Sequence, residues 1–182
     1  GSEDNTQSLV ENYPVKLMNL EKNKGKGKAV EKALKQVQGD IIVLVDADLG
    51  QSVREVEKLV IPILKGKADM TIAEIPVSNG GLGLVRKLAH KGLKLKTGQK
   101  MKAPLSGQRA FRRNIIDTVL PLSTGFGLET GMNLDILNSG YKIKEVKCDF
   151  QHKTTGHSFK GYWHRGKQFI DILVTLMKKR RL

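Results

Sequence analysis

Two aspartates separated by one small residue, Asp46-Ala47-Asp48, form the pattern with the clearest chemical meaning in this sequence. They directly follow the run Ile41–Val45, whose aliphatic side chains are typical of a strand buried on both faces of a sheet. In open α/β sheets, ligands bind outside the carboxyl ends of the strands, where these carboxylates are expected. Paired carboxylates favour a cation between them, and hard oxygen ligands suit Mg²⁺ or Mn²⁺ shared with substrate phosphates. The alternative is a turn whose aspartates cap the following helix.

A glycine- and lysine-rich segment, Asn23–Ala29, is the second pattern that predicts binding. Gly25 and Gly27 allow the backbone to approach an anion closely, and the helix predicted over Val30–Val37 offers free N–H groups at its start. The lysines of the segment are Lys24, Lys26 and Lys28. It is not a Walker A loop, because Ala29 stands where Ser or Thr would follow the glycine–lysine pair. Its alternative role is a flexible basic turn.

Two further segments place polar residues beside glycines at predicted element boundaries: Pro104–Arg109 and Gly125–Thr130. Glu129 would begin a helix, where the helix dipole favours a carboxylate, so its role is either chemical or only that of a helix terminus. His152 follows the last predicted strand, whose end could bring it to the edge that carries the two aspartates. A lone histidine is more often structural than a ligand, so this position alone does not decide its role.

The elements that must position these residues alternate between strand and helix. Predicted strands are Val15–Leu20, Ile41–Val45, Asp69–Ala73, Ser106–Phe111 and Tyr141–Val146. Predicted helices are Val30–Val37, Ser52–Leu64, Leu84–Lys96, Arg113–Val119, Glu129–Leu137 and a closing basic amphipathic helix over about 158–182. This order predicts a single α/β domain over residues 1–182, with a mostly parallel sheet flanked by helices.

Length and composition exclude several classes of protein. The 182 residues are 39% hydrophobic and 27% charged, which is typical of one globular domain. The single cysteine, Cys148, excludes a disulfide framework and favours a reducing compartment. Aromatic residues make up 5% of the chain, which argues against a stacking platform for single-stranded nucleic acid. No apolar run approaches the length of a bilayer span, and no signal peptide is recognised, so a cytoplasmic location is expected.

The net charge of +14 favours anionic partners such as nucleic acid, anionic lipid or phosphorylated small molecules. A nucleic-acid-binding module is the main alternative without enzymatic activity, but it leaves the two aspartates unexplained. The basic run Lys178–Arg181 ends the closing helix and predicts peripheral contact with the inner face of a membrane. A homo-oligomer is compatible with the sequence.

Taken in order, the patterned segments resemble a GT-A fold glycosyltransferase of the family 2 type over nearly the whole chain. Asn23–Ala29 resembles the segment before the helix beside the nucleotide, and Asp46-Ala47-Asp48 resembles the D-x-D metal motif. Ser106–Ala110 resembles the acceptor-side strand, and Gly125–Glu129 resembles a later acidic motif. This last stretch, together with Gly80-Gly81, is similar to the glucosyl-3-phosphoglycerate synthases.

The resemblance implies metal-dependent transfer of a sugar from a nucleotide diphosphate sugar, UDP- or GDP-linked, to a hydroxyl or phosphate acceptor. It implies a site for Mg²⁺ or Mn²⁺ formed by Asp46, Asp48 and His152. The implied donor-binding residues are Gly25, Lys26, Gly27, Lys28, Asp46 and Ala47. The implied acceptor-binding residues are Ser106, Gly107, Arg109 and Gly127. Glu129 is the implied catalytic residue, which would bind the acceptor hydroxyl or take its proton.

The sequence departs from the family pattern in two places. Gly1–Thr6 is similar to the turn that follows the second strand of the family, which implies a chain lacking the first two strands and raises the alternative of a non-catalytic remnant. Arg86 follows Gly80-Gly81 only after Leu82–Val85, unlike the phosphoglycerate-binding loop of the synthases. This departure argues against a phosphoglycerate acceptor. Arg109 and the basic stretch from Arg86 to Lys102 could instead hold another anionic acceptor, such as a phosphate or a polyprenyl phosphate.

Overall fold

The computed structural model describes residue 2 and residues 4–75, 83–151 and 160–179, with the backbone alone for residues 160–165. Four strands form one sheet in the order β1-β3-β2-β4. They are β1 (Ile41–Leu44), β2 (Met70–Glu74), β3 (Arg109–Arg112) and β4 (Ile143–Lys147). β3 runs antiparallel to both of its neighbours, while β2 and β4 are parallel. β1, β2 and β4 therefore point the same way in a mixed sheet, and the predicted α/β class is confirmed.

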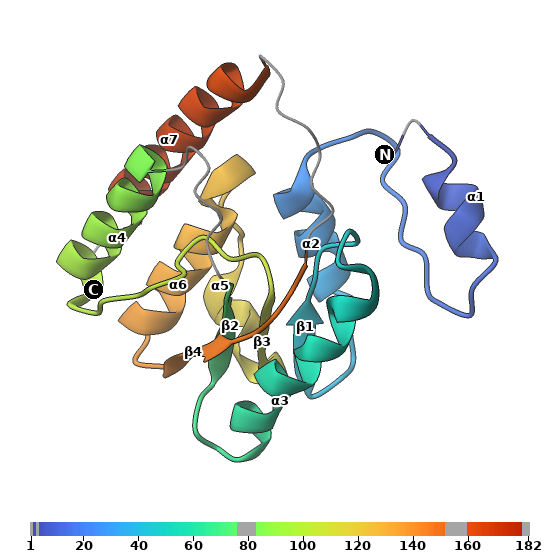
Figure 1. The fold of residues 1–182 in the computed structure, drawn as a ribbon, viewed down its shortest axis with the longest axis horizontal. Coiled ribbons are helices and arrows are strands. Elements are labelled where there is room, and N and C mark those ends of the chain that lie inside the picture. Colours follow the sequence, from blue (N-terminus) through green and yellow to red (C-terminus); the bar gives the residue numbers. More distant parts are fainter. Residues whose placement is uncertain (1, 3, 76–82, 152–159, 180–182) are drawn as a thin grey trace.

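Helices flank both faces of this sheet (Figure 1). The α-helices are α1 (Thr6–Glu11), α2 (Lys26–Leu34), α3 (Val56–Leu64), α4 (Gly83–Thr97), α5 (Ile116–Val119), α6 (Leu128–Asn138) and α7 (Lys160–Lys178). Short 3₁₀ helices are η1 (Gly50–Glu55), η2 (Arg113–Ile115) and η3 (Gly125–Gly127). In the part of the chain that the structure describes, no helix combines the length and apolar composition needed to cross a membrane.

Alternation along the strands divides the core into two layers. Met70, Ile72 and Phe111 point toward the larger layer, which includes buried side chains of α4, α5, α6 and α7. Ala73 and Ala110 point toward the smaller layer, which α3 covers. On that side Thr71 is fully buried, and its hydroxyl donates to the Leu59 carbonyl at 2.8 Å. The sheet is thus fixed between α3 and the helices of the opposite face.

The N-terminal segment differs from its prediction. Val15–Leu20 forms no strand, and the side chains of Val15 and Leu17 are exposed. Alternation favours a strand only where another strand can pair with it, and no described strand pairs with this segment. In Figure 1 the segment and α1 extend away from the sheet.

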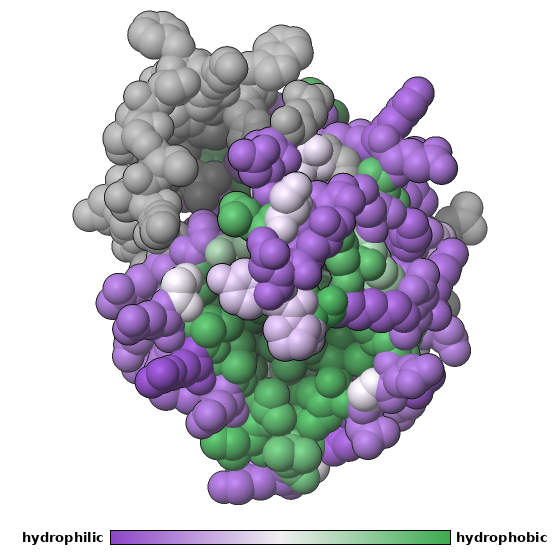
Figure 2. Space-filling view, turned by 90° about the vertical axis from the view of Figure 1, so that its right-hand side faces the viewer, coloured by the Kyte–Doolittle hydropathy of each residue, from purple (hydrophilic) through white to green (hydrophobic). Residues whose placement is uncertain are grey.

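β1 also differs, because its aliphatic sequence is typical of a central strand whereas it lies at one edge of the described sheet. Figure 2 views the molecule from the side of Figure 1 on which β1 and α1 lie, and it shows a broad hydrophobic area there. Exposed apolar side chains just after β1, in η1 and in α3 are Val45, Val53, Ile61 and Leu64.

Candidate active site

Four segments bring polar side chains to the carboxyl end of β1. Asp46 lies two residues beyond the last residue of β1, Leu44, which pairs with Arg109 at the start of β3. Because the two strands are antiparallel, Asp46 and Gln108 meet at the same edge of the sheet. Lys26 is the first residue of α2, and Glu129 is the second residue of α6. Chain segments far apart in sequence therefore converge on one group of charges.

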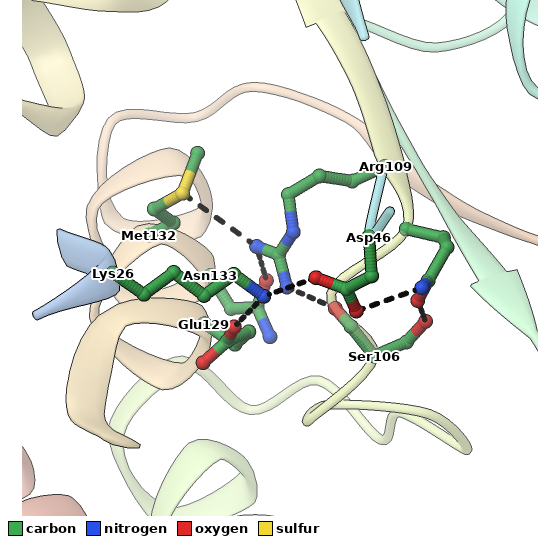
Figure 3. Close-up of polar contacts among 8 residues, drawn as sticks. Lys26, Asp46, Ser106, Arg109, Glu129, Met132 and Asn133 are labelled. Carbon is green, nitrogen blue, oxygen red and sulfur yellow. Dashed lines mark hydrogen bonds and ion pairs between the residues drawn. The ribbon is translucent and has the colours of Figure 1, made fainter. Parts of the chain in front are cut away.

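Lys26 lies between the two carboxylates of this group (Figure 3). Its Nζ is 2.9 Å from Asp46 Oδ1 and 3.4 Å from Glu129 Oε1. The other oxygen of Asp46, Oδ2, accepts a hydrogen bond from Gln108 Nε2 at 2.9 Å. Burial lowers the pKa of Lys26, but attraction to Glu129 and Asp46 outweighs burial, so the pKa is raised above its ordinary value. Lys26 consequently carries its positive charge at neutral pH.

Arg109 lies beneath this group and not at the surface, since only 1% of it is exposed. Its guanidinium donates to the Ser106 carbonyl at 2.5 Å and to Asn133 Oδ1 at 3.3 Å. Asn133 in turn donates to the Pro104 carbonyl at 2.9 Å, which ties α6 to the loop before β3. Burial lowers the pKa of Arg109, while Glu129 opposes that shift. Because it is buried and bonded to the loop before β3 and to α6, Arg109 supports the site from below.

Two glycines implicated by the sequence lie where a side chain would collide. A Cβ on Gly107 would be 2.9 Å from Lys26 Nζ and 3.0 Å from Asp46 Oδ2. Gly107 therefore allows the loop to pass directly beside the ion pair. A Cβ on Gly127 would overlap the hydroxyl oxygen of Thr175 in α7. The location of Gly127 is thus explained by helix packing.

The start of α2 adjoins a small, open hollow. Gly25 has a φ of +82°, which favours glycine, and its N–H donates to Asn23 Oδ1 at 3.0 Å. The hollow is lined by Lys24, Gly27, Lys28 and the segment 122–125. Lys28 is exposed, and its Nζ lies 3.3 Å from Glu31. Lysines beside a helix N-terminus form an environment that favours an anion.

The predicted metal ligands are only partly described. Ala47 and Asp48 are exposed and Asp46 is half-buried, whereas His152 lies outside the described residues. Within the described ranges, no group of three or more His, Cys, Asp and Glu side chains could hold a metal ion. Mg²⁺ is commonly held by one or two carboxylates together with substrate phosphates and water. The carboxylates of Asp46 and Asp48 fit that donor set.

Two polar residues of this arrangement were not assigned from the sequence, namely Gln108 and Asn133. Gln108 is 1% exposed and Asn133 is fully buried. Gln108 stands within the predicted acceptor-side segment, so its position between Gly107 and Arg109 was a usable signal. The sequence around Asn133 contains no comparable signal, because the role of Asn133 depends on the packing of α6 against the loop before β3.

Comparison with known proteins adds a family and a fold. Residues 1–120 match the family model described as Glycosyl transferase family 2. The chain is similar to dolichol-phosphate mannosyltransferase of Pyrococcus furiosus, with 30% identity over 85% of this chain and 46% of the relative. It is 25% identical to undecaprenyl-phosphate 4-deoxy-4-formamido-L-arabinose transferase of Shewanella sediminis, over 97% of this chain and 54% of the relative. The chain thus spans about half the length of these curated relatives.

Among solved structures, glucosyl-3-phosphoglycerate synthase from Mycobacterium tuberculosis, in complex with Mn²⁺, UDP and glucosyl-3-phosphoglycerate, matches with a TM-score of 0.72. The identity is 24%, and the match covers 97% of this chain and 66% of the synthase. At this identity the likeness shows the fold alone, and it confirms the GT-A fold expected from the sequence.

Proposed function

The chain belongs to glycosyl transferase family 2, and from this membership and the geometry of the site we propose that it transfers a sugar from a nucleoside diphosphate donor to a hydroxyl or phosphate acceptor, with Mg²⁺ or Mn²⁺. The observation that carries the proposal is the convergence of Lys26, Asp46 and Glu129 at the carboxyl end of β1. This is the edge at which ligands bind in open α/β sheets.

The donor diphosphate would bind between the start of α2 and the carboxyl end of β1. Lys24 and Lys28 border the hollow beside α2, where backbone N–H groups favour phosphate oxygens. Gly25 and Gly27 leave the backbone accessible there, and Ala47 lies on the strand-end loop. The solved synthase contains UDP, so a UDP-linked sugar is the first donor to test and a GDP-linked sugar the second.

Asp48, with Asp46 and His152, would hold the divalent cation. When bound, the cation neutralises negative charge that develops on the leaving nucleoside diphosphate. Lys26 keeps the Asp46 carboxylate in place at 2.9 Å, and Gln108 fixes its second oxygen. A cation that binds Asp46 must share this carboxylate with Lys26.

Glu129 is the proposed group that binds the acceptor hydroxyl or takes its proton. Its side chain is 13% exposed and is held at the start of α6, 3.4 Å from the Lys26 ammonium. Ser106 and Gly107 would border the acceptor on the β3 side, since Gly107 lies directly beside Asp46. Arg109 would support this wall through the Ser106 carbonyl, and Gly127 would fix the approach to α6.

The proposed acceptor is anionic. The two curated relatives are named for dolichol phosphate and undecaprenyl phosphate, and the solved synthase contains a phosphorylated product. A polyprenyl phosphate is therefore the first acceptor to test.

Nucleotide titration tests the donor and the metal together. We expect calorimetry to detect binding of UDP or GDP only when Mn²⁺ is present. Asp48→Ala should abolish this metal-dependent binding, whereas Asp117→Ala, an exposed aspartate on α5, should leave it unchanged. Binding that survives in Asp48→Ala would refute the metal assignment. If neither nucleotide binds, the donor proposal fails and the non-catalytic remnant is favoured.

Glu129→Gln tests the catalytic assignment. We expect donor binding to persist, while transfer to a polyprenyl phosphate falls about 10²- to 10⁴-fold, the usual contribution of a general acid or base. Glu57→Gln, an exposed first-turn glutamate of α3, is the matched control and should retain transfer. Unchanged turnover in Glu129→Gln would leave Glu129 with only the role of a helix terminus.

A further inference from the structure

Helices α4 and α7 lie side by side on the flank of the molecule farthest from α1 (Figure 1). A Cβ on Gly92 of α4 would collide with the Leu176 side chain of α7. One turn further along α4, the Lys96 ammonium donates to the Lys179 carbonyl at 2.5 Å. Both contacts advance together along the two helices, so α4 and α7 run in the same direction and end together.

The outer face of α7 is apolar although it is exposed. Ile170, Leu173, Val174 and Met177 are 59%, 38%, 39% and 72% exposed. Their spacing of three and four residues places them on one face of the helix. The opposite face supplies Ile172 and Leu176 to the core. Because the core requires only the inner face, the outer stripe is unexplained by folding and marks an interaction surface.

α4 adds positive charge and further apolar side chains to this flank. Leu84 and Leu95 are 75% and 72% exposed. Among the described side chains of the two helices, the exposed lysines are Lys87, Lys91, Lys94, Lys167 and Lys178. α4 contains no acidic residue, and the acid of α7, Asp171, is half-buried and accepts from the Phe126 N–H at 3.1 Å. The exposed flank is therefore apolar and positive.

We propose that this flank, formed by the outer faces of α4 and α7, rests on an anionic lipid bilayer. Exposed leucine, isoleucine and methionine side chains suit the boundary between headgroups and acyl chains, and the lysines suit anionic headgroups. A second copy of the chain is a poorer occupant, because like-charged lysine rows would face each other across the contact. The net charge of +14 strengthens attraction to an anionic surface.

The flank is linked to the candidate active site by one layer of packing. Asp171 and Thr175 of α7 contact η3, which leads directly into α6 and Glu129. If the proposed function holds, a lipid-linked acceptor in the same bilayer would lie on the α7 side of the molecule. Binding of the flank to lipid does not itself depend on the proposed function.

Vesicle flotation tests the inference with the full chain. We expect the chain to float with vesicles of 70% phosphatidylcholine and 30% phosphatidylglycerol. Little of the chain should float with vesicles of phosphatidylcholine alone. The double variant Ile170→Asp/Met177→Asp should reduce partitioning at least tenfold, as should Lys91→Glu/Lys94→Glu, which alters charge without touching the apolar stripe. Leu64→Asp, an equally exposed apolar position on α3, is the matched control and should float like the parent chain.

Two results would overturn the proposal: failure of the parent chain to float, or equal flotation of the parent and both double variants. Light scattering distinguishes a contact between copies, because a dimer that Ile170→Asp/Met177→Asp dissociates would assign the stripe to self-association instead. Metal-dependent UDP binding is measured on the same samples without vesicles. If UDP binds but flotation fails, the surface proposal is wrong while the proposed function stands.

Discussion

The charges of the side chains at the end of β1 balance one another. Two positive groups, Lys26 and Arg109, lie close to two negative groups, Asp46 and Glu129. The two cations act differently. The Lys26 side chain is 47% exposed, so its ammonium is partly open to solvent. Arg109 is enclosed, and its charge is held by a carbonyl and an amide oxygen of the protein. Arg109 therefore provides a fixed positive charge beneath the site, whereas the charge of Lys26 is partly exposed to solvent.

Replacement of this fixed charge should destabilise the domain. Arg109→Met leaves the Ser106 carbonyl and the Asn133 amide oxygen without their donor and removes a cation near Glu129 and Asp46. We expect a loss of about 3 kcal/mol, typical of breaking a buried charge network, and a fall in melting temperature of about 10 °C. Thermal unfolding followed by circular dichroism measures this loss.

Arg113→Met is the matched control, because Arg113 is exposed and donates to the Gln38 carbonyl at 3.0 Å. Its loss should stay below about 1 kcal/mol. Equal losses of stability in the two variants would show that the buried Arg109 contributes no more to stability than the exposed Arg113.

At the level of elements, glycines determine how closely α7 approaches the rest of the domain. An added Cβ would collide with side chains of α7 at Gly92 in α4, and at Gly125 and Gly127 in η3. Three glycines from two elements thus form the surface on which α7 packs. Since η3 precedes α6, this packing also fixes the approach of Glu129 to the site.

Gly127→Ala should therefore weaken the contact between α7 and η3. The new methyl group would overlap Thr175 and lie 3.1 Å from the Asp171 carbonyl oxygen, so α7 must shift. We expect a loss of about 1–3 kcal/mol, seen as a lower melting temperature, with partial recovery in Gly127→Ala/Thr175→Ala. Gly166→Ala in α7 has open space around its Cβ and should be neutral or slightly stabilising. An unchanged melting temperature in Gly127→Ala would contradict the packing argument.

The elements that the sequence predicts correctly are those whose residue pattern is contained within the element itself. The strand expected over Asp69–Ala73 is observed as Met70–Glu74, and the helix expected over Leu84–Lys96 is observed as Gly83–Thr97. The failure at Val15–Leu20 arises because alternation does not reveal whether a neighbouring strand exists. The burial of Arg109 was not predictable either, since it depends on α6 packing against a loop some 25 residues away in sequence.

At the scale of the whole molecule, the charge of +14 is spread over a protein whose candidate site is locally balanced. A chain with this charge attracts any polyanion. This attraction weakens as the salt concentration rises, because the release of counterions then contributes less to binding. Binding that depends on specific carboxylates and a metal should depend less on salt. The two kinds of binding can therefore be separated by ionic strength.

We predict that this chain binds duplex DNA weakly, with an affinity that falls at least 100-fold between 50 and 300 mM NaCl, on the order expected for several phosphate contacts. Mn²⁺-dependent UDP binding should fall less than tenfold over the same range, because direct coordination near Asp48 is short-ranged and screened little. Fluorescence anisotropy with two unrelated duplexes and calorimetry with UDP measure the two affinities. Strong preference for one duplex at 300 mM NaCl, together with absence of UDP binding, would favour a nucleic-acid-binding module over a transferase. Equal, salt-sensitive binding of both duplexes would instead assign the charge to general attraction of anionic surfaces.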